Sequence, residues 1–539
     1  MKQKIIFILL FIATISGNAQ NQTGFGFFTD RDVYVSGEIL LAKIYNPTDN
    51  SSRIVYLDLV NQSGLRISGV SLEIKNNEAS GFLQLPDSLS TGTYLLRAYM
   101  KNSAEKLKTI REIWISNRFD GLEKTKQVKR VAASQTIQHK STQQINIEGI
   151  IPEYATNTNA DASIKIDETL LKEIDGNLLV SVAQTDPSFE SGSFTWSSDH
   201  GNDGLTEKKG IILSGVVIDK KNSMPASGIT VYLTIPDSIP GFQYYQTQDD
   251  GRFYFQLDNY YGQVQAFVQC FGNTPEQRLK IKMDQLFAEP GTLPEFSPQP
   301  ISEEFKNNIT RNIDAVTFQK VFGQDKLKFQ ATPAKTLEPY AYYGKPSNIV
   351  DPHLFIDLPN FTEISRELLP GVKFRNYNNE PTMQVINAAA RDYFKEMPLI
   401  LIDGIPIRNL NVIKDMGTQD IKRVEICQSE RYFGNLRFPG IVAIYTTKSD
   451  YSRIPDTDQF IRLKLEAIQG QANLAEPEKS EPGIPDLRQT FYWNPSEEPK
   501  DTLSVKFSTS SILGKFKLVV RGRLKNGTMI LAEKQFEVK

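Results

Sequence analysis

The sequence predicts a mainly β protein, with tandem β-sandwich domains and one small α+β domain in its second half. From Gly24 to Asn117, short apolar or alternating runs such as VYVSGEILLAKIY and GTYLLRAYM recur between turn residues. The runs IILSGVVID, ITVYLTI and DGRFYFQL repeat this pattern further along the chain. Between Met397 and Thr447, three more such runs follow a short amphipathic helical pattern, which indicates the α+β part.

The N-terminus has the pattern of an export signal. Lys2 and Lys4 precede an apolar run from Ile5 to Ile15, and small residues follow at Gly17 and Ala19. This pattern predicts a signal peptide over residues 1–19, with no cysteine nearby for a lipid anchor. The run is shorter than the roughly 20 residues that a membrane-spanning helix needs, and no later run is long enough. We therefore expect an exported protein without a transmembrane span.

Composition limits the classes of partner and the number of domains. A hydrophobic content of 40% is enough for several cores, and the chain length suggests about three to five domains. The formal net charge of -2 argues against nucleic acid as a partner, because such binding needs a basic excess. Cys270 and Cys427 lie in different predicted domains, so we expect two buried thiols rather than a disulfide.

Residues 20–117 predict the first sandwich, entered through a turn at Ser36-Gly37, with Tyr94 and Leu96 facing the core. The phrases TDRDVYVSGEILLAKIY and LPDSLSTGTYLLRAYM resemble the macroglobulin-like domain of exported Bacteroidetes proteins. A generic immunoglobulin-like sandwich is the alternative, and it implies the same fold. The polar, basic stretch 118–145 predicts a linker.

Two further β units follow. INIEGII, ASIKI and NLLVSVAQ, with Leu178, Val180 and Val182 alternating, predict a second sandwich-like segment over 146–207. Residues 208–290 resemble the carboxypeptidase-regulatory-like domain, a transthyretin-like sandwich that has no peptidase activity. Its most recognisable signature is the turn around Asp250 and Gly251. A calcium pair of Asp249 and Asp250 is the less favoured alternative, because Asp-Gly is also a common turn sequence.

Residues 291–342 predict a proline-rich connector with one helix. The helix starts near Ser302 and Glu304, and its irregular apolar stripe comprises Ile309, Ile313, Val316 and Phe318 or Val321.

Residues 343–450 predict the small α+β domain. Asn360 and Glu363 can cap a short helix that precedes the runs MPLILIDGIPI, QDIKRVEI and PGIVAIYTT, in which Asp403-Gly404 forms a turn and Gly440 opens the last run. This order resembles the plug domain of TonB-dependent outer-membrane receptors. A surrounding barrel would need about twenty-two strands, which the residues after Thr447 do not offer. The resemblance therefore implies a plug without a pore, and an unrelated small sheet is the alternative.

The C-terminal part predicts a polar linker over 451–484 and a closing sandwich over 485–539. The strands DLRQTFYWNP, TLSVKFSTS and KFKLVVRGRL come before an Asn526-Gly527 hairpin turn, and Trp493 is expected in the core. This part resembles the closing sandwich of proteins that combine macroglobulin-like and plug-like domains. It also shows a fainter resemblance to the C-terminal sorting domains of a Bacteroidetes secretion route.

No motif for catalysis or cofactor binding is evident, so we expect no enzyme activity, no cofactor and no metal. The three histidines, His139, His200 and His353, are isolated, and Cys270 in VQCFGNTPEQ lacks the Gly-Glu-Gln context of a macroglobulin thioester. The resemblances imply a periplasmic or outer-membrane-associated scaffold whose plug-like domain engages an envelope partner. Two alternatives remain: a protease-inhibitory macroglobulin relative, and a secreted adhesin or glycan-binding protein.

Overall fold

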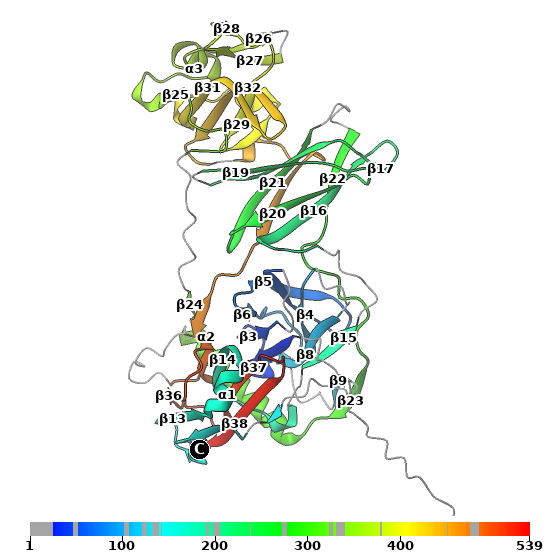
Figure 1. The fold of residues 1–539 in the computed structure, drawn as a ribbon, viewed down its shortest axis with the longest axis vertical. Coiled ribbons are helices and arrows are strands. Elements are labelled where there is room, and N and C mark those ends of the chain that lie inside the picture. The colour runs from blue at the N-terminus through cyan, green and yellow to red at the C-terminus, as the bar shows by residue number, and fades with distance from the viewer. Residues whose placement is uncertain are drawn as a thin grey trace, which may run out of the picture.

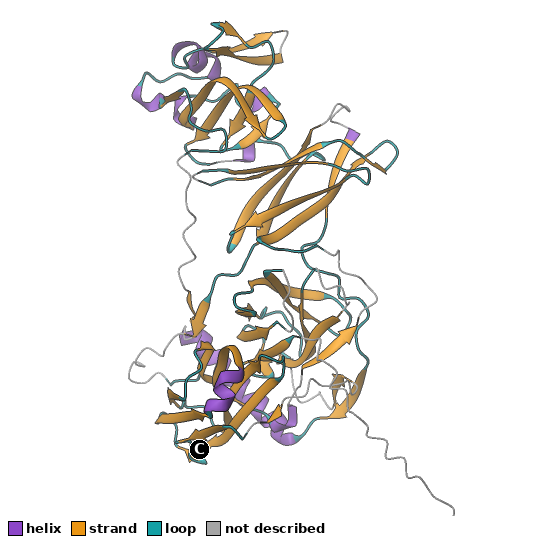
Figure 2. Cartoon of the chain, viewed as in Figure 1, coloured by secondary structure: helices purple, strands orange, loops and turns teal. Residues whose placement is uncertain are grey.

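The chain folds into three stacked bodies of mostly β structure (Figure 1). The computed structural model describes residues 25–46, 52–101, 107–120, 127–131, 140–141, 143–189, 193–197, 205–237, 239–271, 278–322, 327–329, 340–377, 380–449, 451–474 and 485–539. Of the described residues, 53% lie in strands and 11% in helices, which confirms the predicted fold class. Figure 2 shows how few helices accompany the sheets. The predicted signal peptide lies outside the described residues.

The lower body contains the N-terminal sandwich. Its strands are β1 (Gly26–Thr29), β2 (Val33–Val35), β3 (Ile39–Tyr45), β4 (Ile54–Val60), β5 (Arg66–Glu73), β6 (Glu78–Gln84), β7 (Gly92–Tyr99), β8 (Leu107–Ser116) and β15 (Ser193–Ser197). One sheet has the order β1-β3-β6, and the other has the order β15-β8-β7-β4-β5 with β2 paired to β8. Tyr94 and Leu96 are buried in the core between them, as predicted. Strand β15 comes from the segment 146–207, so that segment contributes to two sandwiches.

A second sandwich in the lower body, the composite sandwich, is assembled from two distant parts of the chain. Its elements are β10 (Lys140–Ser141), β11 (Ile145–Glu148), β12 (Glu153–Tyr154), β13 (Asn159–Ile166), α1 (Glu168–Glu173), β14 (Ile174–Gln184), η2 (Pro187–Phe189), β35 (Thr490–Glu497), β36 (Thr502–Ser508), β37 (Gly514–Leu524) and β38 (Met529–Val538). The sheet orders are β11-β13-β36 and β10-β38-β37-β14-β35, with β12 also on β38. The predicted boundaries 146–207 and 485–539 therefore do not separate two sandwiches. Strands of segment 146–207 pair with strands of segment 485–539, so both segments are needed to complete either sheet.

The two sandwiches of the lower body pack on each other. Leu178, Val180 and Val182 face the composite core, as their alternation predicts. Leu179 on the opposite face is equally buried, because it packs with Phe28 of the N-terminal sandwich. The central sheets are therefore covered on both sides, and the lower body has four layers of sheet. Burial on both faces explains why β14 reads as a nearly continuous apolar run.

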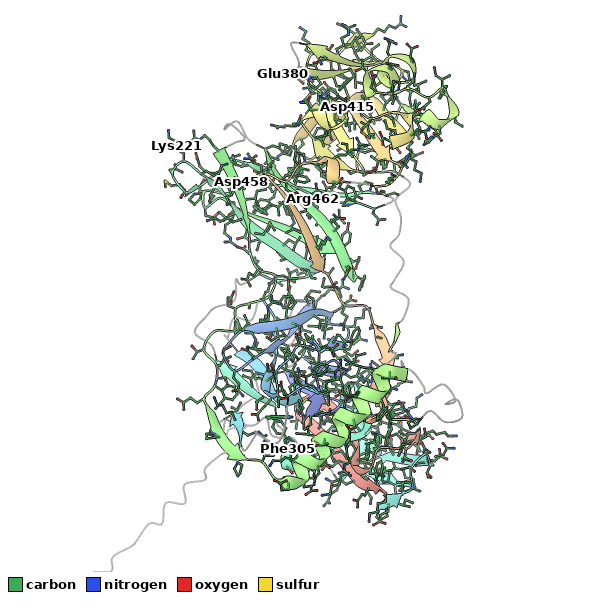
Figure 3. The ribbon with its side chains drawn as sticks, turned by 180° about the vertical axis from the view of Figure 1, so that it is seen from behind. Lys221, Phe305, Glu380, Asp415, Asp458 and Arg462 are labelled. Atoms are coloured by element: carbon green, nitrogen blue, oxygen red, sulfur yellow. The ribbon has the colours of Figure 1, made fainter. Side chains whose placement is uncertain are left out.

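Helix α2 (Glu303–Phe322) lies along the outside of the lower body, where Phe305 marks its first turn in Figure 3. The Ser302 Oγ accepts a hydrogen bond from the Phe305 backbone N at 3.1 Å, which agrees with the predicted start. Phe305 packs against Trp114 and stacks on Phe189 with ring centroids 5.9 Å apart. The helix is thereby fixed to the N-terminal sandwich.

The end of α2 differs from the predicted apolar stripe. Phe318 and Val321 are exposed, at 54% and 73% of their surface. The buried face continues instead through Val316 and Gln319, which donates a hydrogen bond from its amide to the Leu487 carbonyl. A polar side chain that reaches a buried acceptor replaces the expected apolar contact.

Two small ribbons occupy segments that the sequence predicts as linkers or connector. Their strands are β9 (Gln127–Val131), β23 (Phe296–Pro300), β24 (Leu327–Phe329) and β34 (Ala472–Leu474). Strand β9 pairs with β23, and β24 pairs with β34, both antiparallel. Segments 118–145 and 451–484 therefore contain paired strands as well as connecting chain.

The middle sandwich lies between the other two bodies (Figure 1). Its strands are β16 (Gly210–Asp219), β17 (Met224–Pro225), β18 (Thr230–Ile235), β19 (Gly241–Gln246), β20 (Arg252–Asp258), β21 (Gln263–Phe271), β22 (Leu279–Met283) and β33 (Phe460–Glu466). One sheet has the order β17-β16-β20 with β22 on β16, and the other has the order β19-β18-β21-β33. Strand β33 comes from the predicted linker 451–484. The chain thus returns to this sandwich after it has formed the upper body.

The upper body corresponds to the plug-like segment. Its elements are β25 (Asn348–Val350), η4 (Pro352–Leu354), α3 (Phe361–Glu367), β26 (Val372–Tyr377), β27 (Glu380–Asn387), β28 (Asp392–Tyr393), β29 (Leu399–Ile402), β30 (Ile405–Ile407), η5 (Leu410–Val412), η6 (Thr418–Asp420), β31 (Ile421–Phe433), β32 (Leu436–Thr446) and η7 (Tyr451–Arg453). A five-stranded sheet, β25-β31-β32-β29-β30, faces a smaller sheet, β26-β27-β28. Asn360 caps α3 and exchanges hydrogen bonds with Glu363, as the capping-box pattern predicts.

Candidate binding surface

Asp403 and Gly404 form the tight turn between β29 and β30. Their φ values are +48° and +86°, a left-handed pair typical of two-residue hairpin turns. The Asp403 carboxylate accepts hydrogen bonds from the Thr446 backbone N at 2.8 Å and from its Oγ1 at 2.6 Å, which ties the turn to β32. A β-carbon on Gly404 would overlap the Pro240 ring of the middle sandwich. The turn is therefore a contact between two bodies as well as a local bend.

Gly440 lies inside β32 with φ +83°. A β-carbon there would lie 3.1 Å from the Cys427 carbonyl oxygen and 3.1 Å from the Val385 Cβ. The pairing of β31 with β32 shifts register beside this position, between Cys427 and Glu430. Gly440 thus permits a close approach between the two sheets of the upper body, and burial raises the pKa of the neighbouring Cys427 thiol.

Asp250 and Gly251 belong to a turn of the middle sandwich, so the structure does not bring them together with Asp403 and Gly404. The Asp250 carboxylate accepts a hydrogen bond from the Arg252 backbone N at 2.9 Å, and Gly251 has φ +70°. A β-carbon on Gly251 would lie 2.6 Å from the Val217 carbonyl oxygen. Backbone geometry accounts for both residues. Asp249 accepts a hydrogen bond from the Ser227 hydroxyl at 3.1 Å.

The side chains that most often bind metals do not gather in the described part of the chain. Among these residues, no group of three or more His, Cys, Asp or Glu side chains is placed to hold a metal ion. Cys270 and Cys427 are both buried, and no disulfide joins them. His353 lies in η4, while His139 and His200 lie outside the described residues.

The upper body exposes large apolar side chains at one edge. Leu354, Phe355 and Ile356 have 79%, 56% and 70% of their surface exposed, and Ile349 of β25 has 61% exposed. Strand β25 is the outer strand of the five-stranded sheet and pairs with β31. We call these four residues the apolar patch. Within the described part of the chain, Leu354, Phe355 and Ile356 form the longest consecutive run of exposed large apolar residues.

The backbone on both sides of the apolar patch is anchored. The Asp351 carboxylate caps η4 by accepting a hydrogen bond from the His353 backbone N at 3.0 Å. On the other side, the Leu358 backbone N donates to the Thr418 hydroxyl at 3.2 Å, and that hydroxyl also donates to the Asp357 carboxylate. Pro352 and Leu358 are buried, so the loop is fixed at both ends. Leu354, Phe355 and Ile356 are consequently held at the surface between the carboxylates of Asp351 and Asp357.

An aromatic cluster joins the upper body to the middle sandwich. Phe242 of β19 stacks on Tyr342 with ring centroids 4.2 Å apart, and Phe433 of β31 contacts both rings edge-on. Arg462 of β33, labelled in Figure 3, donates to the Tyr451 carbonyl at 2.7 Å. Burial raises the pKa of Tyr342 well above its ordinary value, so its phenol stays neutral. This packing fixes the upper body on its support.

A comparable junction joins the middle sandwich to the lower body. Tyr56 stacks on Tyr99 with centroids 5.6 Å apart, and Phe287 meets Tyr56 edge-on. The Tyr99 hydroxyl accepts a hydrogen bond from the Ala288 backbone N at 2.9 Å. These residues belong to one hydrophobic core with the middle sandwich. The two bodies therefore share buried apolar surface.

Glu73 adds an electrostatic contact to this junction. It lies 3.0 Å from the Lys75 ammonium and accepts a 3.0 Å hydrogen bond from the Tyr261 hydroxyl of the middle sandwich. Burial by itself raises the pKa of Glu73. The hydrogen bonds from Lys75, Tyr261 and Arg53 outweigh this effect and lower the pKa below its ordinary value.

The sequence pattern does not single out the apolar patch. Three large apolar residues in a row are also typical of a buried strand, and periodicity cannot distinguish the two environments. The available signal is the pair Asp351-Pro352, separated from Leu354 only by His353, because a turn-forming pair places the following residues at the surface.

Comparisons with known proteins give only distant structural likeness. No family model matches the chain, and no curated protein matches it. Salmonella alpha-2-macroglobulin reacted with methylamine is 10% identical over 96% of this chain and 39% of its own, with a TM-score of 0.22. Native Escherichia coli alpha-2-macroglobulin is 10% identical over 98% of this chain and 40% of its own, at 0.23. A tetra-tandem repeat from the extending region of a large adhesion protein is 9% identical over 94% and 96%, at 0.13.

The chain thus spans about two fifths of the length of these macroglobulins. At such TM-scores we base no argument on the likeness. A separate finding concerns membranes: in the described residues, no helix combines the length and apolar character needed to span one.

Proposed function

We propose that this chain is an exported, non-enzymatic binding protein of the bacterial cell envelope, and that its upper body binds a protein partner through the apolar patch. The observation that carries the proposal is the exposure of Leu354, Phe355 and Ile356 on an anchored loop. Exposed contiguous apolar residues are costly in water and commonly mark protein interaction sites. The predicted signal peptide and the plug-like resemblance support an envelope location.

The charges beside the apolar patch suggest the chemistry of the partner. Asp351 precedes the run and Asp357 follows it, and both carboxylates are held by local hydrogen bonds. We propose a partner protein with an apolar groove that has basic side chains on its rim. The groove would cover Leu354, Phe355 and Ile356, and the basic rim would complement the two carboxylates.

The arrangement of the three bodies suits a binding protein that holds its contact surface at a distance. The upper body lies at the opposite end of the molecule from the C-terminus (Figure 1). Both junctions along the way contain packed aromatic rings, Phe242 stacked on Tyr342 and Phe287 edge-on to Tyr56. Rigid presentation lowers the entropy that binding would otherwise cost.

A site-specific crosslinking experiment tests the proposal. A photoreactive amino acid replaces Phe355 in the full chain, expressed in its native cells, and a matched chain carries it at the exposed Phe318 of α2. We expect one envelope protein to crosslink at position 355 and not at 318. The purified partner should then bind the parent chain, and binding should be lost with the triple change Leu354→Ser, Phe355→Ser and Ile356→Ser.

The control is the double change Phe318→Ser and Val321→Ser, which removes exposed apolar residues of α2 and should leave binding intact. Both variants should retain the parent melting temperature, because the altered side chains are exposed. Crosslinking at position 355 to a second copy of this chain would overturn the partner proposal. Binding that survives the triple change would overturn it as well.

A further inference from the structure

A small polar cavity lies where three parts of the lower body meet. Its volume is about 40 Å³, and its walls come from the turn after β1, from strands β8, β14 and β37, and from helix α2. A single ordered water needs about 10 to 15 Å³ by the same kind of measure. The cavity therefore has room for more than one water or for one small ion. None of the residues in its walls belongs to the apolar patch.

The Arg521 guanidinium on β37 is the one cation of this cavity wall without an anionic neighbour at ion-pair distance among the described residues. Its Nε is buried and has no hydrogen-bond acceptor. The group lies over the Phe28 ring, with the guanidinium carbon 4.5 Å from the ring centroid. Desolvation and, next, the nearby Arg111 lower the pKa of Arg521 to about 10. A buried cation normally has a carboxylate at ion-pair distance, whereas Asp32 and Glu533 favour the charge of Arg521 only from further away.

The carboxylates in the cavity wall are already engaged. Asp30 pairs with Arg31 at 3.2 Å and accepts a hydrogen bond from the Tyr34 hydroxyl at 2.8 Å. Asp32 pairs with Arg111. They therefore neutralise other cations, and the charge of Arg521 remains without a close counter-ion.

The third carboxylate of the wall and both lysines are engaged in the same way. Asp186 accepts hydrogen bonds from the Ser188 backbone N at 2.9 Å and from the Asn308 amide at 3.0 Å. Lys515 pairs with Glu304 at 2.9 Å, and Lys517 lies 3.7 Å from Glu533. Among the described residues of the wall, Arg521 is again the cation without an ion pair.

Asn312 of α2 provides a second, independent sign of a missing ligand. Its side chain is 5% exposed and lines the cavity, yet its Oδ1 has no hydrogen-bond partner. A buried amide normally has its polar atoms satisfied. The oxygen and nitrogen of an amide are interchangeable by a flip of the side chain, so this group can present an N–H to the cavity.

We propose that this cavity binds one small anion, a chloride ion or the carboxylate of a formate-sized molecule, held by Arg521 and the Asn312 amide. The anion supplies the counter-charge that Arg521 lacks and an acceptor for the amide. Because the wall includes Arg111 of the N-terminal sandwich, Arg521 of the composite sandwich and Asn312 of α2, the bound anion connects all three. The site is independent of the proposed partner surface.

Melting temperatures of the full chain in different sodium salts test the site. Chloride and formate are compared with gluconate, which is too large for the cavity, at equal ionic strength. A ligand that binds only the folded state raises the melting temperature with its concentration. We expect a rise of about 3 to 6 °C for each tenfold increase in the small anion above its dissociation constant. A larger rise with formate identifies a carboxylate site, and a larger rise with chloride identifies a halide site.

Two variants and one direct measurement complete the test. Arg521→Gln should abolish the difference between the small anions and gluconate, while Lys534→Gln, which removes an exposed cation from the adjacent β38, should preserve it. Chloride-35 magnetic resonance of the parent chain should show line broadening that formate reverses, and this readout holds even if Arg521→Gln fails to fold. Equal melting temperatures in all three salts, together with no reversible broadening, would show that only water fills the cavity and would overturn the proposal.

Discussion

Replacing Gly404 by alanine tests the contact between the turn of the upper body and the middle sandwich. Alanine at φ +86° carries about 1 to 2 kcal/mol of left-handed strain. Its β-carbon would also overlap the Pro240 ring, and overpacking of this kind costs about 1 to 3 kcal/mol. We therefore expect Gly404→Ala to lower the free energy of unfolding of the upper body by about 2 to 5 kcal/mol.

Two further variants separate the strain from the overlap. Gly344 of the upper body has φ +75° with open space around its α-carbon, so Gly344→Ala should cost only the strain of about 1 to 2 kcal/mol. Pro240→Gly removes the ring that the new methyl group meets. In that background Gly404→Ala should also cost only the strain, which gives a coupling energy of about 1 to 3 kcal/mol between positions 404 and 240.

Hydrogen exchange followed by mass spectrometry can measure these costs body by body. Amides of β29 and β32 should exchange about tenfold faster for each 1.4 kcal/mol lost, while amides of the composite sandwich should keep their parent rates. If Gly404→Ala costs the same with and without Pro240, the overlap is not with the middle sandwich. If Gly344→Ala costs as much as Gly404→Ala, strain alone explains both, and the contact contributes nothing.

Three other predictions follow from single interactions. Asp403→Asn replaces one acceptor of the Thr446 hydrogen bonds by a donor, so urea denaturation should show a loss of about 1 to 3 kcal/mol, and an unchanged midpoint would contradict the role of this carboxylate. Because folding lowers the pKa of Glu73, the stabilisation by its carboxylate is present above the unfolded pKa of about 4.3 and is lost as the pH falls through the folded pKa. The melting temperatures of the parent and of Glu73→Gln should therefore differ most near neutral pH and converge in acid. Phe242→Ala removes the ring stacked on Tyr342, which should cost about 3 to 5 kcal/mol of packing at this junction. Small-angle scattering should then show a more variable spacing of the bodies, and an unchanged scattering curve would argue against this junction.

Local features of the fold follow from short patterns in the sequence. The helix cap at Asn360, the hairpin at Asp403-Gly404 and the start of α2 at Ser302 depend on residues within a few positions of each other. Their physical causes are side-chain hydrogen bonds and backbone conformation, which a sequence shows directly. The strand content follows from periodicity in the same way.

The pairing of distant strands does not follow from such patterns. Strand β33 alternates apolar and charged residues, yet nothing in FIRLKLE indicates that it joins β21. Strand β14 is apolar on both faces, and several strands in the chain would suit it equally well as neighbours. The sequence does not predict the cavity around Arg521, because residues far apart in the chain form its wall. It does not predict the apolar patch, because a run of apolar residues does not show whether their side chains are exposed.

The composite sandwich has a consequence for how the chain is made. Ribosomes deliver residues in order, so β14 is synthesised about 300 residues before β35 and β37, between which it is paired. At about 5 to 20 residues per second this interval is roughly 15 to 60 s. Throughout it, the apolar stretch from Leu178 to Val182 has neither of its neighbours, and an unpaired apolar strand is a template for aggregation. During synthesis this strand therefore stays without its sheet neighbours until the last four strands emerge.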